Sequence, residues 1–259
     1  MKTRCSPSWG GFIARQTASV APDRIRRLGL LVPAGIAVDS LLYPDPERIP
    51  YPPLVNYGYN DEVVFLVPAR AAETLRPGET ARIAADLDYL VCEDVCIPAS
   101  ARVSLELPVS ATAAVPASRD AGLIARYRER LPVRSEAWAL RAGRTDGGFV
   151  LAARPPEGWP GTIGGSYFFP VNPTALDHTA PQPAFRAADG ELRLRLAESP
   201  YLDPSLDRLE GVLVLADGSA FDAAGRRALE VSVPIEPLAA AAGAPDPRTP
   251  HPAPRSALA

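Results

Sequence analysis

The chain has 259 residues and a mass of 27.5 kDa, enough for one large domain or two small ones with a buried core. A net charge of −3 gives no basic surface for nucleic acid, and no apolar run approaches the roughly 20 residues that span a bilayer. A membrane-spanning protein is excluded and a nucleic-acid binder disfavoured, while 30 prolines favour strands and turns over long helices.

The N-terminal segment, residues 1–29, is mostly polar and has no apolar period, so we expect it to be poorly ordered. Lys2 and Arg4 are not followed by the apolar stretch of a signal peptide, so we expect no export signal in the chain as written. A Pro-rich run from Pro44 to Pro53 then predicts extended backbone.

Residues 30–115 are predicted to form a first β-rich domain. Residues 62–67, a β-branched run that ends before Pro68, are the first expected strand. Two stretches in which apolar and polar residues alternate are the others: residues 80–91, and residues 102–107, which end before Pro108. Cys92 and Cys96 therefore lie on a loop between two strands, and not at the start of a helix.

An amphipathic segment from Ser118 to Leu131 predicts a helix, with Asp120 near its start and Pro132 after its end. We assign residues 116–132 as a linking helix between two domains. The second domain, residues 133–237, is predicted to be a β-sandwich because short strands alternate with Gly-rich turns. Its expected strands are residues 137–142, 148–153, 166–169, 191–197, 211–215 and 229–235. Residues 238–259 are a Pro- and Ala-rich tail.

The Cys92 and Cys96 pair is the feature that carries chemistry. With three residues between them on a tight loop, the two sulfurs can come within disulfide range. So small a ring suits redox exchange, since structural disulfides gain most by closing long loops. The spacing alone leaves a redox pair, a structural disulfide and two buried thiols open. Glu93 and Asp94 keep a thiol from becoming hyper-reactive, which favours exchange with a dedicated, docked partner.

Metal and cofactor sites have weaker support. A closed zinc site needs four ligands, and the chain has only the histidines His178 and His251. Copper(I) accepts fewer and softer ligands, so Cys92, Cys96 and His178 form an alternative copper site. No phosphate-binding loop or nucleophile elbow is present, and we expect no resident cofactor.

Three motifs resemble the N-terminal periplasmic domain of DsbD/ScsB-type thiol:disulfide interchange proteins: Asn56-Tyr57-Gly58-Tyr59, Glu62-Val63-Val64-Phe65 and Tyr89-Leu90-Val91-Cys92-Glu93-Asp94-Val95-Cys96-Ile97-Pro98. Softer matches follow in the second half, at Tyr167-Phe168-Phe169-Pro170, Asp177-His178 and Gly211-Val212-Leu213-Val214. The resemblance covers roughly Leu30 to Pro237.

The resemblance implies an all-β chain of two immunoglobulin-like β-sandwich domains, with the redox cysteines on a loop of the first. It implies that Cys96 forms the mixed disulfide and that Cys92 resolves it, in a protein-disulfide reductase that works in the periplasm. Tyr57, Tyr59, Tyr89, Glu93 and Asp94 become residues that shield the loop or contact partners.

The implied partners are a thioredoxin-like electron-donor domain, disulfide-bearing periplasmic acceptor proteins and a membrane electron transporter acting in trans. Cytochrome c biogenesis and copper tolerance are the processes in which such relays serve.

Three departures from the family pattern bear on these expectations. Residues 1–29 show neither a signal peptide nor an N-terminal strand, Tyr89 stands where the family usually has Trp, and the chain ends in a Pro-rich tail instead of membrane helices. These departures predict a fragment, a mis-started reading frame or a stand-alone domain that receives electrons in trans.

Two other hypotheses for the function of the cysteine pair stay open. Cys92-Glu93-Asp94-Val95-Cys96 is also similar to the copper-chaperone motif of Sco proteins, although there a helix follows the cysteines, whereas here Ile97-Pro98 leads into a predicted strand. The third reading is a non-enzymatic β-sandwich adaptor whose cysteines form a structural disulfide.

Overall fold

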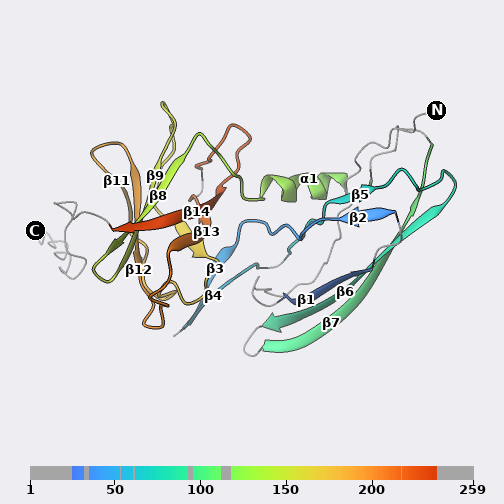
Figure 1. The fold of residues 1–259 in the computed structure, drawn as a ribbon, viewed down its shortest axis with the longest axis horizontal. Helices are drawn as coiled ribbons and strands as arrows, with labels where there is room; N and C mark the ends of the chain where they lie inside the picture. Colours follow the sequence, from blue (N-terminus) through green and yellow to red (C-terminus); the bar gives the residue numbers. More distant parts are fainter. Residues whose placement is uncertain are drawn as a thin grey trace, which may run out of the picture.

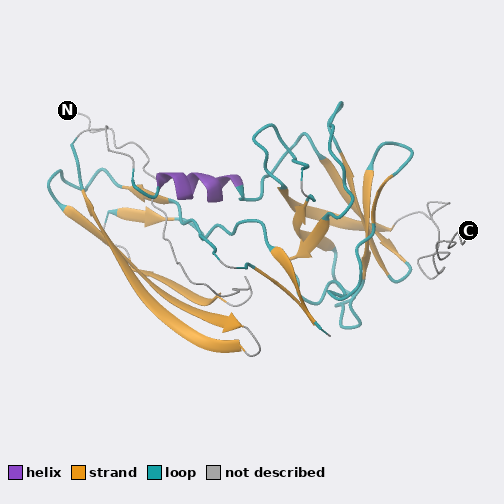
Figure 2. Cartoon of the chain, turned by 180° about the vertical axis from the view of Figure 1, so that it is seen from behind, coloured by secondary structure: helices purple, strands orange, loops and turns teal. Residues whose placement is uncertain are grey.

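The computed structural model describes residues 25–31, 35–52, 54–60, 62–92, 96–111, 118–216 and 218–237. These residues form two β-rich units side by side along the long axis of the molecule, with one described helix beside the first (Figures 1 and 2). The all-β class predicted from the sequence is confirmed. No described helix is long and apolar enough to cross a bilayer.

The first unit is built on a three-stranded antiparallel sheet in the order β1-β6-β7, with bounds Ile25–Leu31, Thr80–Cys92 and Cys96–Pro108. Strands β6 and β7 form one long hairpin (Figure 1), paired without a register shift from Thr80↔Pro108 to Cys92↔Cys96. Two small antiparallel pairs complete the unit: β2 (Ile36–Val38) with β5 (Ala69–Ala71), and β3 (Glu47–Tyr51) with β4 (Leu54–Gly58).

Two expectations for the first unit are wrong. Residues 25–29, expected to be poorly ordered, belong to β1, whose backbone pairs with β6; the N-terminal strand missed in the sequence is therefore present. Residues 62–67 form no strand, because Leu66 makes only an isolated bridge with Leu42. The side chains of Val63 to Val67 are buried all the same, so this apolar run marks core and not sheet. Residues 1–24 and the tail 238–259 lie outside the described residues.

Helix α1 (Ala121–Glu129) lies inside the predicted 118–131 segment and covers the core of the first unit. Its buried residues Ile124 and Tyr127 pack with Tyr59 and with the apolar run that contains Val64. The Tyr127 hydroxyl donates a 2.6 Å hydrogen bond to the Glu62 carbonyl. The helix is thus part of the first unit's packing, and its role as a linker stays a prediction.

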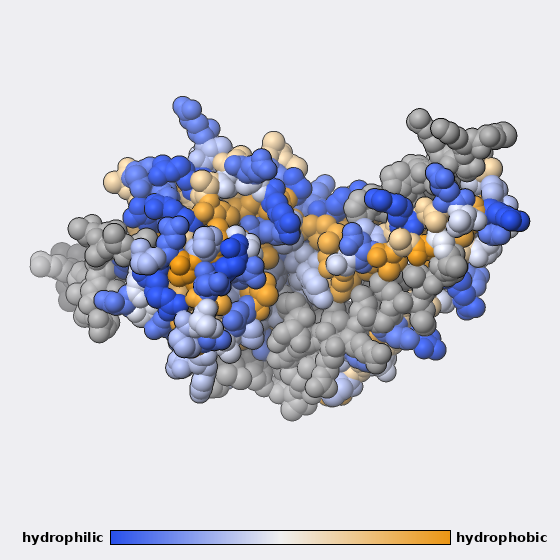
Figure 3. Space-filling view, in the orientation of Figure 1, coloured by the Kyte–Doolittle hydropathy of each residue, from blue (hydrophilic) through white to orange (hydrophobic). Residues whose placement is uncertain are grey.

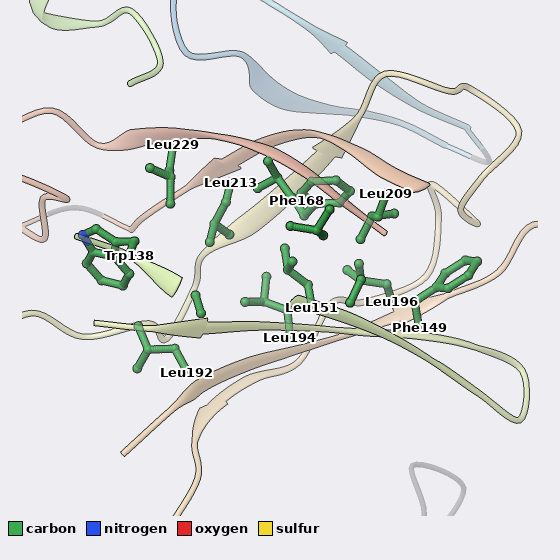
Figure 4. Close-up of a cluster of buried hydrophobic side chains, with 14 of the residues drawn as sticks. Trp138, Phe149, Leu151, Phe168, Leu192, Leu194, Leu196, Leu209, Leu213 and Leu229 are labelled. Atoms are coloured by element: carbon green, nitrogen blue, oxygen red, sulfur yellow. The ribbon is translucent and has the colours of Figure 1, made fainter. Parts of the chain in front are cut away.

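The second unit is a β-sandwich whose strands follow the order β10-β13-β14-β8-β9-β12-β11. The bounds are β8 Ala139–Thr145, β9 Gly148–Arg154, β10 Tyr167–Pro170, β11 Ala184–Arg186, β12 Leu192–Ala197, β13 Arg208–Val214 and β14 Ala228–Pro237. β14 joins the two layers, since it pairs antiparallel with β13 and then parallel with β8. Leucine and aromatic side chains fill the space between the layers (Figure 4). The six predicted strands are confirmed, and β11 was missed.

A buried carboxylate lies on the second unit. Glu191, whose side chain is 2% exposed, receives hydrogen bonds from Arg141 (2.6 and 3.0 Å) and Arg193 (3.1 Å). Burial alone would raise the pKa of Glu191, but the two guanidinium groups outweigh it and hold the pKa below its usual value. A depressed folded-state pKa stabilises the fold above the unfolded-state pKa, and this contribution is lost as the pH falls through the folded-state value.

Glu191→Gln is therefore expected to lower the free energy of unfolding by about 1–3 kcal/mol at pH 7, because charged hydrogen bonds are lost. The difference from wild type should shrink as the pH falls below about 4.5. Urea unfolding at pH 7, 4.5 and 3 measures it, with the exposed Glu136→Gln as the matched control. A difference that stays constant with pH would contradict this assignment.

The two units are tied together by a nearly buried aspartate. Asp45, whose side chain is 4% exposed, accepts hydrogen bonds from Arg130 Nε (2.6 Å) and from the Arg227 guanidinium (2.9 Å). Arg130 follows helix α1, whereas Arg227 precedes β14 of the sandwich. Figure 3 shows two lobes with a saddle between them, and these contacts join the lobes.

Candidate functional site

The cysteine pair lies at the tip of the β6–β7 hairpin. Cys92 is the last residue of β6, Cys96 is the first residue of β7, and the register pairs them directly. The sequence placed both on the connecting loop; they are instead the closing pair of the ladder. The hairpin tip points toward the middle of the molecule, on the side of the second unit (Figure 1). Glu93, Asp94 and Val95 lie outside the described residues.

The ladder also identifies which kind of pair the cysteines form. Hydrogen-bonded and non-hydrogen-bonded pairs alternate along an antiparallel ladder. Just beyond the end of the ladder that lies far from the cysteines, the Val109 amide donates to the Glu79 carbonyl (2.8 Å). Because the two kinds of pair alternate, the backbone N–H and C=O groups of the odd-numbered residues of β7 point toward β6. Pro98 and Pro108, which have no N–H to donate, both occupy even positions, as this parity requires.

Cys92 and Cys96 therefore form a non-hydrogen-bonded pair. In such a pair the two Cα atoms lie about 4.5 Å apart. A disulfide spans Cα separations of roughly 4.4–6.8 Å. The backbone pairing is thus compatible with a disulfide between the two cysteines.

One described side chain next to the pair is exposed. Ile97, which follows Cys96, is 60% exposed, an unusual position for a large apolar side chain. Tyr89 is half-buried on β6, and its backbone pairs with Ala99 and Ile25. The roles of Tyr89, Glu93 and Asp94 at the redox pair stay predictions.

Tyr59 belongs to the core of the first unit. Its side chain is 2% exposed, its ring packs edge-on against Phe65 at a centroid distance of 5.6 Å, and its hydroxyl donates to the Pro44 carbonyl (2.9 Å). Burial raises the pKa of Tyr59 well above its usual value, so the phenol is neutral. These contacts give Tyr59 a packing role, and its predicted shielding role is untested.

Tyr57 is bound to the second unit. Its hydroxyl lies 2.8 Å from His178 Nδ1 and 3.0 Å from the Tyr167 hydroxyl, and its ring packs edge-on against Phe169. The guanidinium of Arg48 on β3 covers the Tyr167 ring at 5.6 Å. The β3–β4 hairpin is therefore docked on the sandwich. No local pattern indicated this cluster, because it joins Arg48 and Tyr57 to residues that lie more than 100 positions further along the chain.

Both ring nitrogens of His178 are engaged. Nε2 lies 2.7 Å from the Pro173 carbonyl, which only accepts, so Nε2 carries the hydrogen. Nδ1 lies 2.8 Å from the Tyr57 hydroxyl, within hydrogen-bond distance. A copper site on Cys92, Cys96 and His178 would require these bonds to break, which makes His178 a poor candidate ligand.

The comparisons with known proteins concern the family and the fold of the segment that contains the two cysteines. Residues 23–108 match the family model described as "Thiol:disulfide interchange protein DsbD, N-terminal". This segment contains β1, the β6–β7 hairpin and both cysteines, and it is a thiol:disulfide interchange domain of the DsbD N-terminal type. No curated protein matches the chain significantly.

The fold of both units matches a solved structure, the crystal structure of the N-terminal periplasmic domain of ScsB from Proteus mirabilis. The match has a TM-score of 0.56 at 15% identity and covers 87% of this chain and 85% of that one. At this identity the likeness shows the fold, and it confirms the predicted immunoglobulin-like architecture.

Proposed function

We propose that Cys92 and Cys96 are the redox pair of a thiol:disulfide interchange protein that passes electrons to disulfide-bearing acceptor proteins. The observation that carries this proposal is the non-hydrogen-bonded pairing of the two cysteines at the end of the β6–β7 hairpin, inside the segment that matches the DsbD N-terminal family. The solved relative is a periplasmic domain. We infer the same compartment and a protein-disulfide reductase activity for this chain.

The exchange proceeds in two balanced steps. The Cys96 thiolate attacks one sulfur of the acceptor disulfide, a mixed disulfide forms, and the acceptor's other sulfur leaves as a thiolate. The Cys92 thiolate then attacks Cys96 Sγ and releases the acceptor's second thiol. Two electrons pass to the acceptor, and the Cys92–Cys96 disulfide that forms is reduced again by a thioredoxin-like dithiol, fed by a membrane electron transporter.

The reduction potential of the pair tests this proposal. The oxidised fraction is measured across a series of glutathione and dithiothreitol buffers by alkylation and mass. We expect a reversible two-electron transition between about −120 and −270 mV, where exchange proteins lie. A pair that stays oxidised below about −300 mV would make the disulfide structural and favour the non-enzymatic adaptor. Cys5→Ser is the control, because it removes the third thiol and leaves the pair intact.

A further inference from the structure

The sheet that carries the redox pair has an open edge. In the strand order β1-β6-β7, β7 is an edge strand. Within the described part of the chain no strand pairs with the outer side of β7. Figures 1 and 2 show β7 as the outer rim of the long hairpin. An edge of this kind presents unpaired N–H and C=O groups that another extended chain can pair with.

The parity of the ladder identifies the outward-facing groups. Even-numbered residues of β7 form non-hydrogen-bonded pairs with β6, so their backbone groups point away from it. Besides Cys96 itself, four residues offer both a donor and an acceptor there: Ser100, Arg102, Ser104 and Glu106. The lack of an N–H on Pro98 and Pro108 blunts only the two ends of this edge.

The side chains along the β7 edge would not select a bound segment by its charge, because the two charged ones are paired within the sheet. Arg102 pairs with Asp86 on the neighbouring strand at 2.5 Å, and Glu106 lies 3.6 Å from Arg82. Ser100 and Ser104 are small and exposed. Recognition through this edge would therefore read the main chain of a bound segment and tolerate many sequences.

We propose that the outer edge of β7 binds an extended segment of the acceptor protein as an added strand, which brings the acceptor's disulfide to Cys96. This inference rests on the proposed function. The edge begins at the reactive residue, the exposed Ile97 offers an apolar contact beside it, and main-chain pairing suits a donor that serves several acceptors. Because Pro98 lacks an N–H, donation to the added strand beyond Cys96 resumes at Ser100, four residues along β7.

The test compares two chromogenic probes on the reduced protein: the mixed disulfide of thionitrobenzoate with cysteine, and the same group on the terminal cysteine of an extended, threonine-rich peptide. Cys96 attacks the cysteine sulfur and thionitrobenzoate leaves; Cys92 then releases the peptide thiol. We expect the peptide to react about tenfold faster than cysteine, equivalent to one or two net hydrogen bonds. Peptides with the cysteine at either end test both strand directions.

The decisive variant is Ser100→Pro/Ser104→Pro, which removes two outward donors and leaves the ladder to β6 intact. It should react with the cysteine probe as wild type does and lose the advantage of the peptide, whereas Ser100→Ala/Ser104→Ala keeps that advantage. Hydrogen exchange should show amide protection at residues 100–106 when Cys92→Ser holds the peptide.

Three results would overturn the proposal: equal rates for both probes, an unchanged peptide advantage in the proline variant, or a β7-dependent dimer by sedimentation that the proline variant abolishes. Failure of the proposed function looks different, because the cysteine probe would then react equally with wild type and Cys96→Ser.

Discussion

Cys92→Ser is expected to accumulate a covalent complex with a disulfide-bearing acceptor, because the mixed disulfide on Cys96 loses the thiol that resolves it. Cys96→Ser should form no such complex and reduce the acceptor at less than about 1% of the wild-type rate, since the attacking thiolate is absent. The measurement is non-reducing mass analysis after the reduced variants are mixed with an oxidised thioredoxin-like protein.

The paired variants make the assignment of roles falsifiable. Both serines occupy the same non-hydrogen-bonded pair of the ladder, so the two variants differ only in which strand keeps its thiol. Trapping by Cys96→Ser instead of Cys92→Ser would exchange the two roles and leave the redox pair itself intact. Equal trapping by both would mean that neither thiol is selected, and trapping that disappears in Cys5→Ser would remove the site.

The hairpin was within reach of sequence reasoning. The alternating residues before Cys92 and after Cys96 predicted two strands with the cysteines at their junction, as the structure shows. Pro98 and Pro108 also indicate that the even-numbered residues of this strand form non-hydrogen-bonded pairs, because a proline has no N–H to donate to the neighbouring strand. Once the register between the two strands is known, the positions of these prolines identify Cys92 and Cys96 as a non-hydrogen-bonded pair.

Other features depend on tertiary contacts that no local pattern encodes. β1 is a strand because β6 offers it a partner, although residues 25–29 carry no clear alternation. The apolar run at residues 63–67 has strong β propensity but is buried by helix α1 and forms only one bridge. The family resemblance predicted Tyr57 beside the redox loop, whereas its described partners, Tyr167 and His178, lie on the second unit.

That second unit is fixed to the first through side chains that matter for stability. Asp45 is nearly buried and lies between two guanidinium groups, Arg130 on its own side and Arg227 on the sandwich. The removal of one partner from a buried ion pair costs about 3–5 kcal/mol when the remaining charge stays dry. Here the two arginine side chains are 33% and 38% exposed and can regain water, so the cost is smaller.

Asp45→Ala is therefore expected to lower the free energy of unfolding by about 2 kcal/mol and to uncouple the two units. Trp138 and Trp159 both lie in the sandwich, so tryptophan fluorescence in a Trp9→Phe background follows the second unit, whereas far-ultraviolet circular dichroism follows all strands. The urea midpoints from the two probes should coincide in wild type and separate in the variant. The fluorescence midpoint should then lie at the higher urea concentration, since the sandwich has the larger core.

In a double-mutant cycle, Arg227→Ala should lower the free energy of unfolding less in the Asp45→Ala background than in wild type. The exposed Glu157→Ala is the control, and coincident midpoints in Asp45→Ala would mean that this carboxylate does not hold the units together.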